Sequence, residues 1–69
     1  MSIQNILVVC VGNICRSPMA EYFLKHSFPE RIIHSAGISA LIGYPADEKA
    51  LYCMQGLGID MQGHRAQKL

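Results

Sequence analysis

The residue types best suited to chemistry lie in one short segment, where Cys10 and Arg16 are separated by five residues. A cysteine thiolate is a strong nucleophile, and a guanidinium binds two oxygens of a phosphoryl group at once. A lysine in the same place would supply only a point charge. The pair therefore indicates attack on phosphorus, with Cys10 as the nucleophile and Arg16 stabilising the charge that develops in the transition state.

The residues between this pair predict a loop whose backbone N–H groups surround an anion. Gly12 allows the backbone to approach a ligand closely. The expected phosphate-binding residues are Val11, Gly12, Asn13, Ile14, Cys15 and Arg16. The backbone N–H groups of these residues and the guanidinium of Arg16 would also lower the pKa of Cys10 and hold it as the thiolate. Ser17, the next residue, has two compatible roles, as the N-cap of the following helix and as a hydrogen-bond donor to the Cys10 sulfur.

The apolar pattern places this loop between a strand and a helix. Residues 6–11 form a continuous run rich in β-branched side chains, which is typical of a strand buried on both faces of a parallel sheet. Ser17 and Pro18 then predict the start of a helix over residues 18–27. Its core-facing stripe would comprise Ala20, Phe23, Leu24 and either Ser27 or Phe28. A turn of this kind collects anions, because free N–H groups and the helix dipole both point into it.

The rest of the chain predicts a second strand and a second helix. Residues 31–36 have the short apolar pattern of a strand, and residues 37–45 form a loop that contains glycine and proline. Asp47 would cap a helix that closes near Gly58. The buried side of this helix would comprise Ala50 or Leu51, Met54 and Leu57, with Cys53 beside it as a packing cysteine. Residues 66–69 have the pattern of a further helix start. The order of elements indicates an α/β fold with a parallel sheet.

The composition excludes several classes of protein. A chain of 69 residues permits one domain, residues 1–69, and its 51% apolar and 16% charged content is that of a globular protein. A net charge of +1 gives no basic surface for nucleic acid or for membrane lipid. Residues 1–5 lack the cationic region of a signal peptide, so a cytoplasmic location is expected. Three cysteines in that compartment argue for reactive or buried thiols, and the scattered histidines predict no metal site.

The loop and its surroundings also carry a family resemblance. Residues 9–21 read Val-Cys-Val-Gly-Asn-Ile-Cys-Arg-Ser-Pro-Met-Ala-Glu, which resembles the signature of the low-molecular-weight protein tyrosine phosphatases. Residues 34–37, 45–47 and 63–69 are similar to consecutive segments of bacterial members of that family. The resemblance covers the whole chain and implies a doubly wound parallel sheet, of which these residues form roughly the first βαβα half. It also implies hydrolysis of phosphotyrosine monoesters through a phosphocysteine intermediate at Cys10, without a metal or an organic cofactor.

The resemblance assigns roles to further residues. It implies a hydrogen-bond network that shapes the loop, with the members Asn13, Ser17, Ser35 and His64. It favours a redox role for Cys15, as the partner of Cys10 in a reversible disulfide that prevents overoxidation. The loop after the second strand would supply an apolar wall for the substrate ring, although its side chains could equally be ordinary loop residues. The residues of this wall would be Leu41, Ile42 and Tyr44.

One part of the family's machinery has no counterpart in this sequence. The general acid of the family is an aspartate in an Asp-Pro-Tyr segment, and these 69 residues contain no such segment. Glu21 lies in the first predicted helix, where a structural role is expected. Protonation of the leaving group typically contributes about 10²–10⁴-fold to the rate. The chain is therefore interpreted as the N-terminal portion of a phosphatase domain, slow by itself and least impaired on aryl phosphates.

The resemblance also implies partners, and two alternative functions stay open. The substrate would be a phosphotyrosine protein, such as a bacterial tyrosine kinase that controls exopolysaccharide export, and inorganic phosphate would be the product. One alternative is a thioredoxin-coupled arsenate reductase, which shares the fold and the Cys-x5-Arg loop but needs further redox cysteines. Another is an inactive anion-binding fragment that self-associates by pairing its open strand edges.

Overall fold

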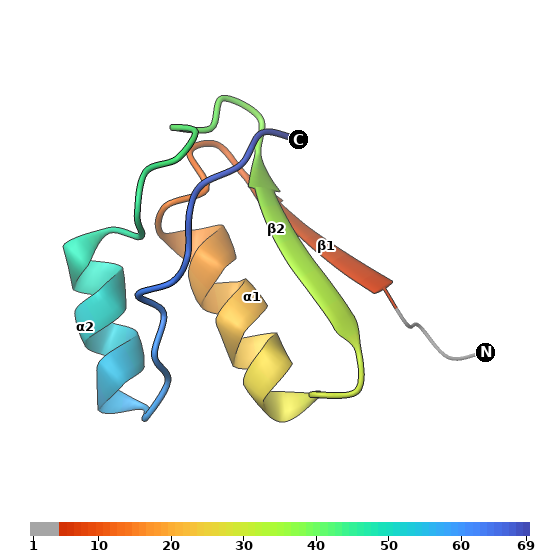
Figure 1. Ribbon diagram of the computed structural model, residues 1–69, viewed down its shortest axis with the longest axis vertical. Helices are drawn as coiled ribbons and strands as arrows, with labels where there is room; N and C mark the ends of the chain where they lie inside the picture. The colour runs from red at the N-terminus through yellow and green to blue at the C-terminus, as the bar shows by residue number, and fades with distance from the viewer. Residues whose placement is uncertain (1–4) are drawn as a thin grey trace.

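The computed structural model describes residues 5–69, which form four elements of secondary structure. In chain order these are β1 (Asn5–Cys10), α1 (Arg16–Ser27), β2 (Ile32–Gly37) and α2 (Glu48–Gly56) (Figure 1). The expectation that no signal peptide precedes the first strand concerns residues 1–4 and lies outside the described residues. No helix within residues 5–69 is long and apolar enough to cross a membrane.

The strands β1 and β2 lie side by side as a parallel pair, and α1 makes the crossover between them (Figure 1). In this register Ile6 lies opposite Ile33, and Cys10 lies opposite Gly37. A parallel pair needs a crossover because the chain has to return to the starting edge before the second strand can run in the same direction. The α/β fold predicted from the sequence is therefore confirmed.

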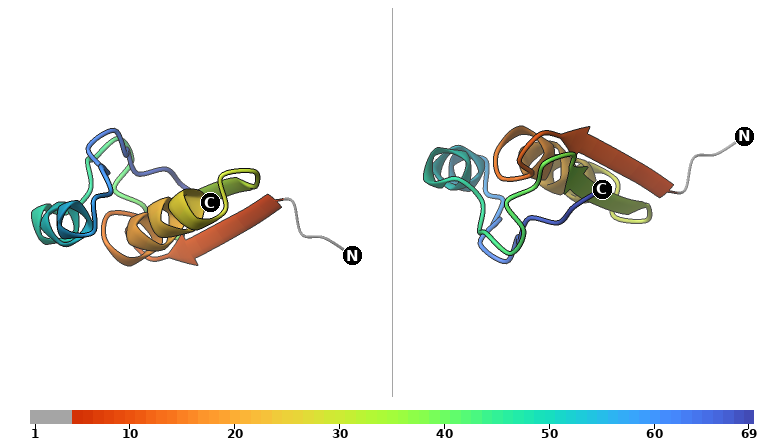
Figure 2. Two further views of the ribbon diagram at one scale, coloured as in Figure 1. Left: turned by 90° about the horizontal axis from the view of Figure 1, so that it is seen from below. Right: turned by 90° about the horizontal axis from the view of Figure 1, so that it is seen from above.

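The helix α1 covers only one face of this sheet (Figure 2). Ile33, on the covered face, is 2% exposed, whereas Leu7 and Val9, on the other face, are 54% and 42% exposed. Successive side chains of a strand alternate between the two faces, so every second residue points to the uncovered side. The prediction that residues 6–11 are buried on both faces is therefore wrong within the described part of the chain.

The start of α1 differs from the prediction. The helix begins at Arg16, earlier than the expected start at Pro18, and its N-cap position falls on Cys15. Cys15 makes no side-chain capping bond, and the hydroxyl of Ser17 lies inside the helix, 2.7 Å from the sulfur of Cys10. The predicted N-cap role of Ser17 is therefore wrong, because the hydroxyl is engaged with the sulfur instead.

The face of α1 that meets the sheet also differs from the prediction. The expected apolar stripe is wrong at Phe23 and Phe28, which are 50% and 43% exposed, whereas its members Ala20 and Leu24 are half-buried. The buried residues of the helix are Ser17, Pro18 and Glu21. Glu21 accepts a hydrogen bond from Ser35 of β2, and this polar contact faces the sheet where the apolar stripe was expected.

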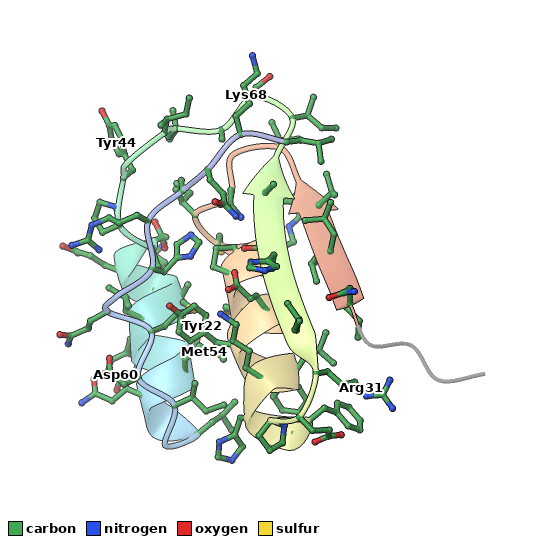
Figure 3. The ribbon with its side chains drawn as sticks, turned by 45° about the vertical axis from the view of Figure 1, so that its right-hand side comes forward. Tyr22, Arg31, Tyr44, Met54, Asp60 and Lys68 are labelled. Carbon is green, nitrogen blue, oxygen red and sulfur yellow. The ribbon has the colours of Figure 1, made fainter. Side chains whose placement is uncertain are left out.

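The helix α2 packs beside α1 and begins as predicted. The side chain of Asp47 accepts a hydrogen bond from the backbone N–H of Lys49 at 3.0 Å and so caps the first turn. Buried apolar side chains of α2 and of the chain around it form the core, and they are Ala46, Ala50, Met54, Ile59 and Met61. Tyr22 of α1 packs against this cluster, and Figure 3 shows Tyr22 and Met54 between the two helices.

The end of α2 corrects two predictions. Leu57 is 61% exposed and does not join the buried side of the helix. Gly58 has a φ of 77° and reverses the chain, after which the N–H of Ile59 bonds to the carbonyl of Met54 at 2.9 Å. This reversal carries Ile59 into the core in place of Leu57. Cys53 is exposed, so its predicted packing role is also wrong.

The C-terminal segment lies beside the end of β2 (Figure 1). The N–H of Gly37 donates to the carbonyl of Gln67 at 2.9 Å, and the carbonyl of Gly37 accepts from the N–H of Leu69 at 3.0 Å. The prediction that residues 66–69 begin a helix is therefore wrong, because the edge of β2 binds their backbone. A Cβ atom at Gly37 would lie 2.5 Å from the carbonyl oxygen of Val11, so this close packing requires glycine.

Candidate active site

The loop between β1 and α1 lines a pocket of about 570 Å³. The lining residues are Val8, Val9, Cys10, Val11, Gly12, Asn13, Ile14, Cys15, Arg16, Ser17 and Ala20. The structure thus brings the predicted nucleophile and the predicted phosphate-binding residues into one concave site. The site lies at the carboxyl end of β1, which is where open α/β sheets typically bind their ligands.

The backbone carbonyl groups of residues 10–14 all accept hydrogen bonds from other parts of the chain. The loop after β2 supplies N–H donors to the first three, from Ile38 to Cys10 at 2.9 Å, Ser39 to Val11 at 2.9 Å and Leu41 to Gly12 at 3.2 Å. The other two accept from Nε2 of His64, to Asn13 at 2.8 Å, and from the N–H of Asp47, to Ile14 at 2.6 Å. The N–H of a trans peptide points opposite to the carbonyl of the same peptide group. These five bonds therefore turn the N–H groups of residues 11–15 away from the groups that donate to the carbonyls.

The N–H groups of the loop are available to an anion. The N–H of Asn13 donates to the sulfur of Cys10 at 3.2 Å. Within residues 5–69 the N–H groups of Ile14, Cys15 and Arg16 have no acceptor. Asn13, with a φ of 59°, is the residue in the left-handed conformation, which asparagine tolerates and which helps successive N–H groups converge. The loop therefore presents several unpaired donors beside a thiol.

The thiol of Cys10 is in an environment that favours its ionised form. Burial raises its pKa, but hydrogen bonds from the Ser17 hydroxyl and from the backbone N–H groups of Ser17, Asn13 and Gly12 lower it more. The pKa therefore lies below the ordinary value of 9.0. A thiolate is the nucleophilic form of cysteine, so these contacts favour the reactive form of Cys10.

Asn13 is the centre of the hydrogen-bond network around the loop. It is fully buried, and its Nδ2 donates to the hydroxyl oxygens of Ser17 at 2.9 Å and of Ser35 at 2.8 Å. Because Asn13 supplies a hydrogen to the Ser17 oxygen, the hydroxyl hydrogen of Ser17 is left to donate to the sulfur of Cys10. One side chain thus connects the sheet to the nucleophile.

Two residues of α1 extend this network away from the loop. The hydroxyl of Ser35 donates to Oε1 of Glu21, and Nζ of Lys25 donates to Oε2 at 2.6 Å. Glu21 is only 7% exposed, and a buried carboxylate is stable only with such partners. The contacts agree with the structural role expected for Glu21. Ser17, Glu21 and Lys25 follow one another at intervals of four residues along one helix face. This spacing could have indicated from the sequence that the three side chains belong to one network.

His64 holds the loop from the opposite side. It is 5% exposed, and its Nε2 lies 2.8 Å from the carbonyl oxygen of Asn13. A carbonyl can only accept, so Nε2 must carry the hydrogen. The ring of Tyr22 meets the imidazole edge-on, with the centroids 6.1 Å apart. The structure therefore brings together the residues that the family resemblance grouped, which are Asn13, Ser17, Ser35 and His64.

Gln67 is a member of the network that the sequence did not reveal. Its backbone N–H donates to Oδ1 of Asn13 at 2.9 Å, and its side-chain Nε2 donates to the carbonyl of Ser35 at 2.8 Å. The first contact joins residues that are 54 positions apart. No local pattern marks a backbone contact of this kind, so only the fold could show it.

Other predicted site residues occupy different surroundings. Arg16 is exposed at the start of α1, and within residues 5–69 its guanidinium has no hydrogen bond or ion pair.

The three residues of the predicted substrate wall are exposed and do not line the pocket, and these are Leu41, Ile42 and Tyr44. Tyr44 points away from the body of the molecule (Figure 3). The wall remains a prediction.

Cys15 lies at the junction of the loop and the core. It packs against the buried apolar cluster, and both Cys10 and Cys15 are free thiols in this structure. The disulfide between them therefore stays a prediction. Among residues 5–69 no three His, Cys, Asp or Glu side chains are grouped so that they could hold a metal ion.

The fold and the loop define an α/β protein in which a cysteine and unpaired backbone N–H groups share one pocket at the end of the first strand. Residues 5–69 match the model of one protein family, the low molecular weight phosphotyrosine protein phosphatases. The match covers nearly all of the sequence. This chain belongs to that family.

Individual relatives agree with the family match. The chain is 67% identical over its whole length to the low molecular weight protein-tyrosine-phosphatase Ptp of Acinetobacter johnsonii, and covers 49% of that protein. The crystal structure of the Erwinia amylovora tyrosine phosphatase AmsI is 50% identical and superposes with a TM-score of 0.95, over 99% of this chain and 45% of that one. Vibrio vulnificus Wzb in complex with benzylphosphonate gives a TM-score of 0.95 at 43% identity, over 99% of this chain and 49% of that one. The chain thus spans about half the length of these relatives.

Proposed function

We propose that this chain supplies the nucleophile and the phosphate-binding loop of a phosphatase that hydrolyses phosphotyrosine monoesters. The observation that carries the proposal is the orientation of the loop, in which the carbonyl groups of residues 10–14 bond outward while unpaired N–H groups and the Cys10 sulfur share one pocket. A phosphoryl group offers several oxygen acceptors to such donors. The Vibrio vulnificus relative binds benzylphosphonate, a phosphonate attached to an aromatic group, which supports the same ligand class here.

The first step of the proposed reaction is attack by the Cys10 thiolate on phosphorus. A sulfur–phosphorus bond forms while the bond from phosphorus to the phenolic oxygen breaks. The leaving phenolate takes the bonding electron pair and then a proton from an acid or from water. The loop N–H groups and the guanidinium of Arg16 stabilise the equatorial oxygens of the phosphoryl group in the transition state. Arg16 is suited to this because no contact within residues 5–69 holds its guanidinium elsewhere.

The second step regenerates the enzyme. Water attacks the phosphorus of the phosphocysteine, the sulfur–phosphorus bond breaks, and the sulfur leaves as a thiolate with the electron pair. The water gives up a proton to a base or to solvent, and inorganic phosphate is released. The Ser17 hydroxyl, 2.7 Å from the sulfur, stabilises the negative sulfur both as the attacking group and as the leaving group.

The rate at which this chain hydrolyses a phosphate ester should depend on how basic the leaving oxygen is. No Asp or Glu among residues 5–69 lines the pocket, in keeping with the lack of an Asp-Pro-Tyr segment in the sequence. A missing general acid typically costs about 10²–10⁴-fold, and the cost is smallest when the leaving oxygen is already weakly basic. We therefore propose that p-nitrophenyl phosphate is a better substrate for this chain than phenyl phosphate.

The finer parts of the proposal concern the cellular setting. We propose a phosphotyrosine protein as the physiological substrate, with a bacterial tyrosine kinase of exopolysaccharide export as the partner and the cytoplasm as the location. A disulfide between Cys10 and Cys15 would protect the nucleophile, and residues 1–69 would act as one structural unit. The family match gives no support to the arsenate-reductase alternative.

Self-association of the chain is a separate proposal that the open face of the sheet supports. Leu7, Val9 and Ile32 are 54%, 42% and 56% exposed on this face, and the outer edge of β1 has no partner strand within residues 5–69. Apolar side chains and free strand edges both favour pairing with a second copy. Sedimentation at increasing protein concentration tests this, and a monomer at every concentration would refute it.

The catalytic proposal is tested by release of p-nitrophenol from its phosphate ester under reducing conditions. Cys10→Ser is the control, and intact mass excludes a longer contaminant. Turnover that is lost in Cys10→Ser, together with a phosphorylated Cys10 trapped in acid and found by mass spectrometry, would support the mechanism. A chain that binds phosphate but gives neither product nor phosphocysteine would refute it and leave an anion-binding protein.

A further inference from the structure

We infer that the backbone N–H of Gln67 is a positioning group for the nucleophile, because it fixes the orientation of the Asn13 side-chain amide and thereby makes the Ser17 hydroxyl a donor to the Cys10 sulfur. The inference rests on the proposed function and adds to it a residue that does not touch the substrate. It follows from which atoms of this network can donate and which can only accept.

The side-chain amide of Asn13 could in principle adopt two orientations related by a half turn. Its oxygen and its nitrogen have nearly the same shape, so the partners decide which atom faces which neighbour. Asn13 is fully buried, so a wrong orientation would leave polar atoms unpaired at substantial cost. The N–H of Gln67 can only donate, and it lies 2.9 Å from Oδ1. This contact directs Nδ2 towards the two serine hydroxyls.

The direction of every other bond in the network follows from that orientation. Nδ2 donates to the oxygens of Ser17 and Ser35, so each hydroxyl has its single hydrogen left for another acceptor. The hydrogen of Ser35 goes to the carboxylate of Glu21, and the hydrogen of Ser17 goes to the Cys10 sulfur. With the amide reversed, Oδ1 would face a Ser35 oxygen whose hydrogen is already used, and it would draw the Ser17 hydrogen away from the sulfur. The donor at Gln67 and the acceptor at Glu21 thus select the same orientation.

The position of Gln67 is itself fixed by two further hydrogen bonds. Its carbonyl accepts from the N–H of Gly37 at 2.9 Å, and its side chain donates to the carbonyl of Ser35 at 2.8 Å. The next residue offers a matched control, since within residues 5–69 the N–H of Lys68 has no acceptor. The two neighbouring N–H groups therefore differ in whether they contact the network.

The test compares Gln67→Pro with Lys68→Pro, because proline removes the N–H at each position. Gln67→Ala keeps the N–H and loses only the side-chain bond to Ser35, so its alkylation profile should follow that of Lys68→Pro. The rate at which iodoacetamide alkylates Cys10 is measured from acid to alkaline pH. Fragment mass spectrometry distinguishes the label on Cys10 from labels on Cys15 and Cys53. None of these substitutions removes an ionisable side chain of the pocket or of the network, which besides Cys10 are Cys15, Arg16, Glu21, Lys25 and His64.

The expected result has a distinctive dependence on pH. At acidic pH, alkylation of Cys10 should be at least about tenfold slower in Gln67→Pro than in Lys68→Pro, since fewer molecules carry the thiolate. At alkaline pH, where the thiol is fully ionised in both variants, the rates should converge. A change in accessibility alone would alter the rate at every pH. Rates that agree within about twofold throughout would overturn the inference.

A second pair of variants covers the case in which a proline prevents folding, as judged by circular dichroism. The chain is assembled by ligation at Cys53, with an ester in place of the amide between Ala66 and Gln67, or of the amide between Gln67 and Lys68. Each ester weakens a carbonyl that accepts one hydrogen bond, from Gly43 at Ala66 and from Gly37 at Gln67. Only the first ester removes a bonded N–H, so the same difference in alkylation is expected and its absence overturns the inference.

Alkylation and hydrolysis report separately on the two proposals. A native chain whose Cys10 is alkylated readily at acidic pH but which does not hydrolyse p-nitrophenyl phosphate would refute the proposed function and leave the role of Gln67 intact. A hydrolytically active chain in which Gln67→Pro behaves as Lys68→Pro would refute only the role of Gln67.

Discussion

The contact between Ser17 and Cys10 gives a prediction whose size can be estimated. The hydroxyl lies 2.7 Å from the sulfur and donates to it, and Ser17→Ala removes this bond while leaving the backbone donors of the loop in place. A hydrogen bond to a charged group contributes about 1.5–3 kcal/mol. At 1.36 kcal/mol for each tenfold change, Ser17→Ala should lower the thiolate population of Cys10 by about 10- to 150-fold at pH values below its pKa.

The assay is the pH dependence of Cys10 alkylation, accompanied by hydrolysis of p-nitrophenyl phosphate. Ser39→Ala is the matched control, because Ser39 is exposed and contacts the loop only through its backbone N–H, which alanine retains. Ser17→Ala should react slowly at acidic pH and approach the native rate at alkaline pH, while Ser39→Ala should follow the native profile. An unchanged profile for Ser17→Ala would show that the backbone donors alone hold the thiolate and would contradict the prediction.

Three further predictions concern stability. Glu21→Gln should lower stability by about 1 kcal/mol and Tm by about 4–8 °C, because the amide binds both of its partners less strongly than the carboxylate, and an unchanged Tm would contradict this. Gly37→Ala should unfold at a clearly lower temperature than Gly56→Ala, since a Cβ at the first position meets a carbonyl oxygen at 2.5 Å, whereas at the second it meets no atom of residues 5–69 within 4 Å outside its own helical turn; equal melting curves would disprove the steric argument. The Tm advantage of the native chain over Cys10→Ser should grow as the pH rises from the lowered pKa of Cys10 towards the ordinary value of 9.0, and a flat or reversed trend would show that folding does not lower this pKa. The sign follows because a group with a lowered pKa stabilises the fold above its unfolded value, and this contribution is lost as the pH falls through the folded value.

The order of elements and the position of the loop could be predicted because their signals are local. A β-branched run and a Cys-x5-Arg segment follow one another within residues 6–16, and the loop connects neighbouring elements. Ser17 and Pro18 indicated the helix that follows, although its first residue is Arg16. The cap at Asp47 is local in the same way, since its side chain bonds to a backbone group two residues further on. Features of this kind depend on a few consecutive side chains and little else.

Which side chains are buried could not be predicted from local signals of this kind. The apolar side chains of Leu7 and Phe23 suggested the core, yet both are about half exposed, at 54% and 50%. Which face of a strand or helix is covered depends on neighbouring elements, and here the polar contact between Glu21 and Ser35 lies between α1 and the sheet. The role of Gln67 could not be predicted from the sequence for a related reason. Gln67 acts through its backbone N–H, which every residue except proline carries.

The hydrogen bonds from the loop after β2 have a consequence for how such a site can diversify. Ile38, Ser39 and Leu41 hold the carbonyl groups of the nucleophile loop through their backbone N–H groups, so their side chains are not needed for that task. Two of these side chains are large and apolar, and they are 61% and 44% exposed at Ile38 and Leu41. Substitutions at these two positions can change the outer surface while the backbone bonds that shape the loop stay in place. Under the proposed function, one phosphate-binding loop can in this way be combined with many different recognition surfaces.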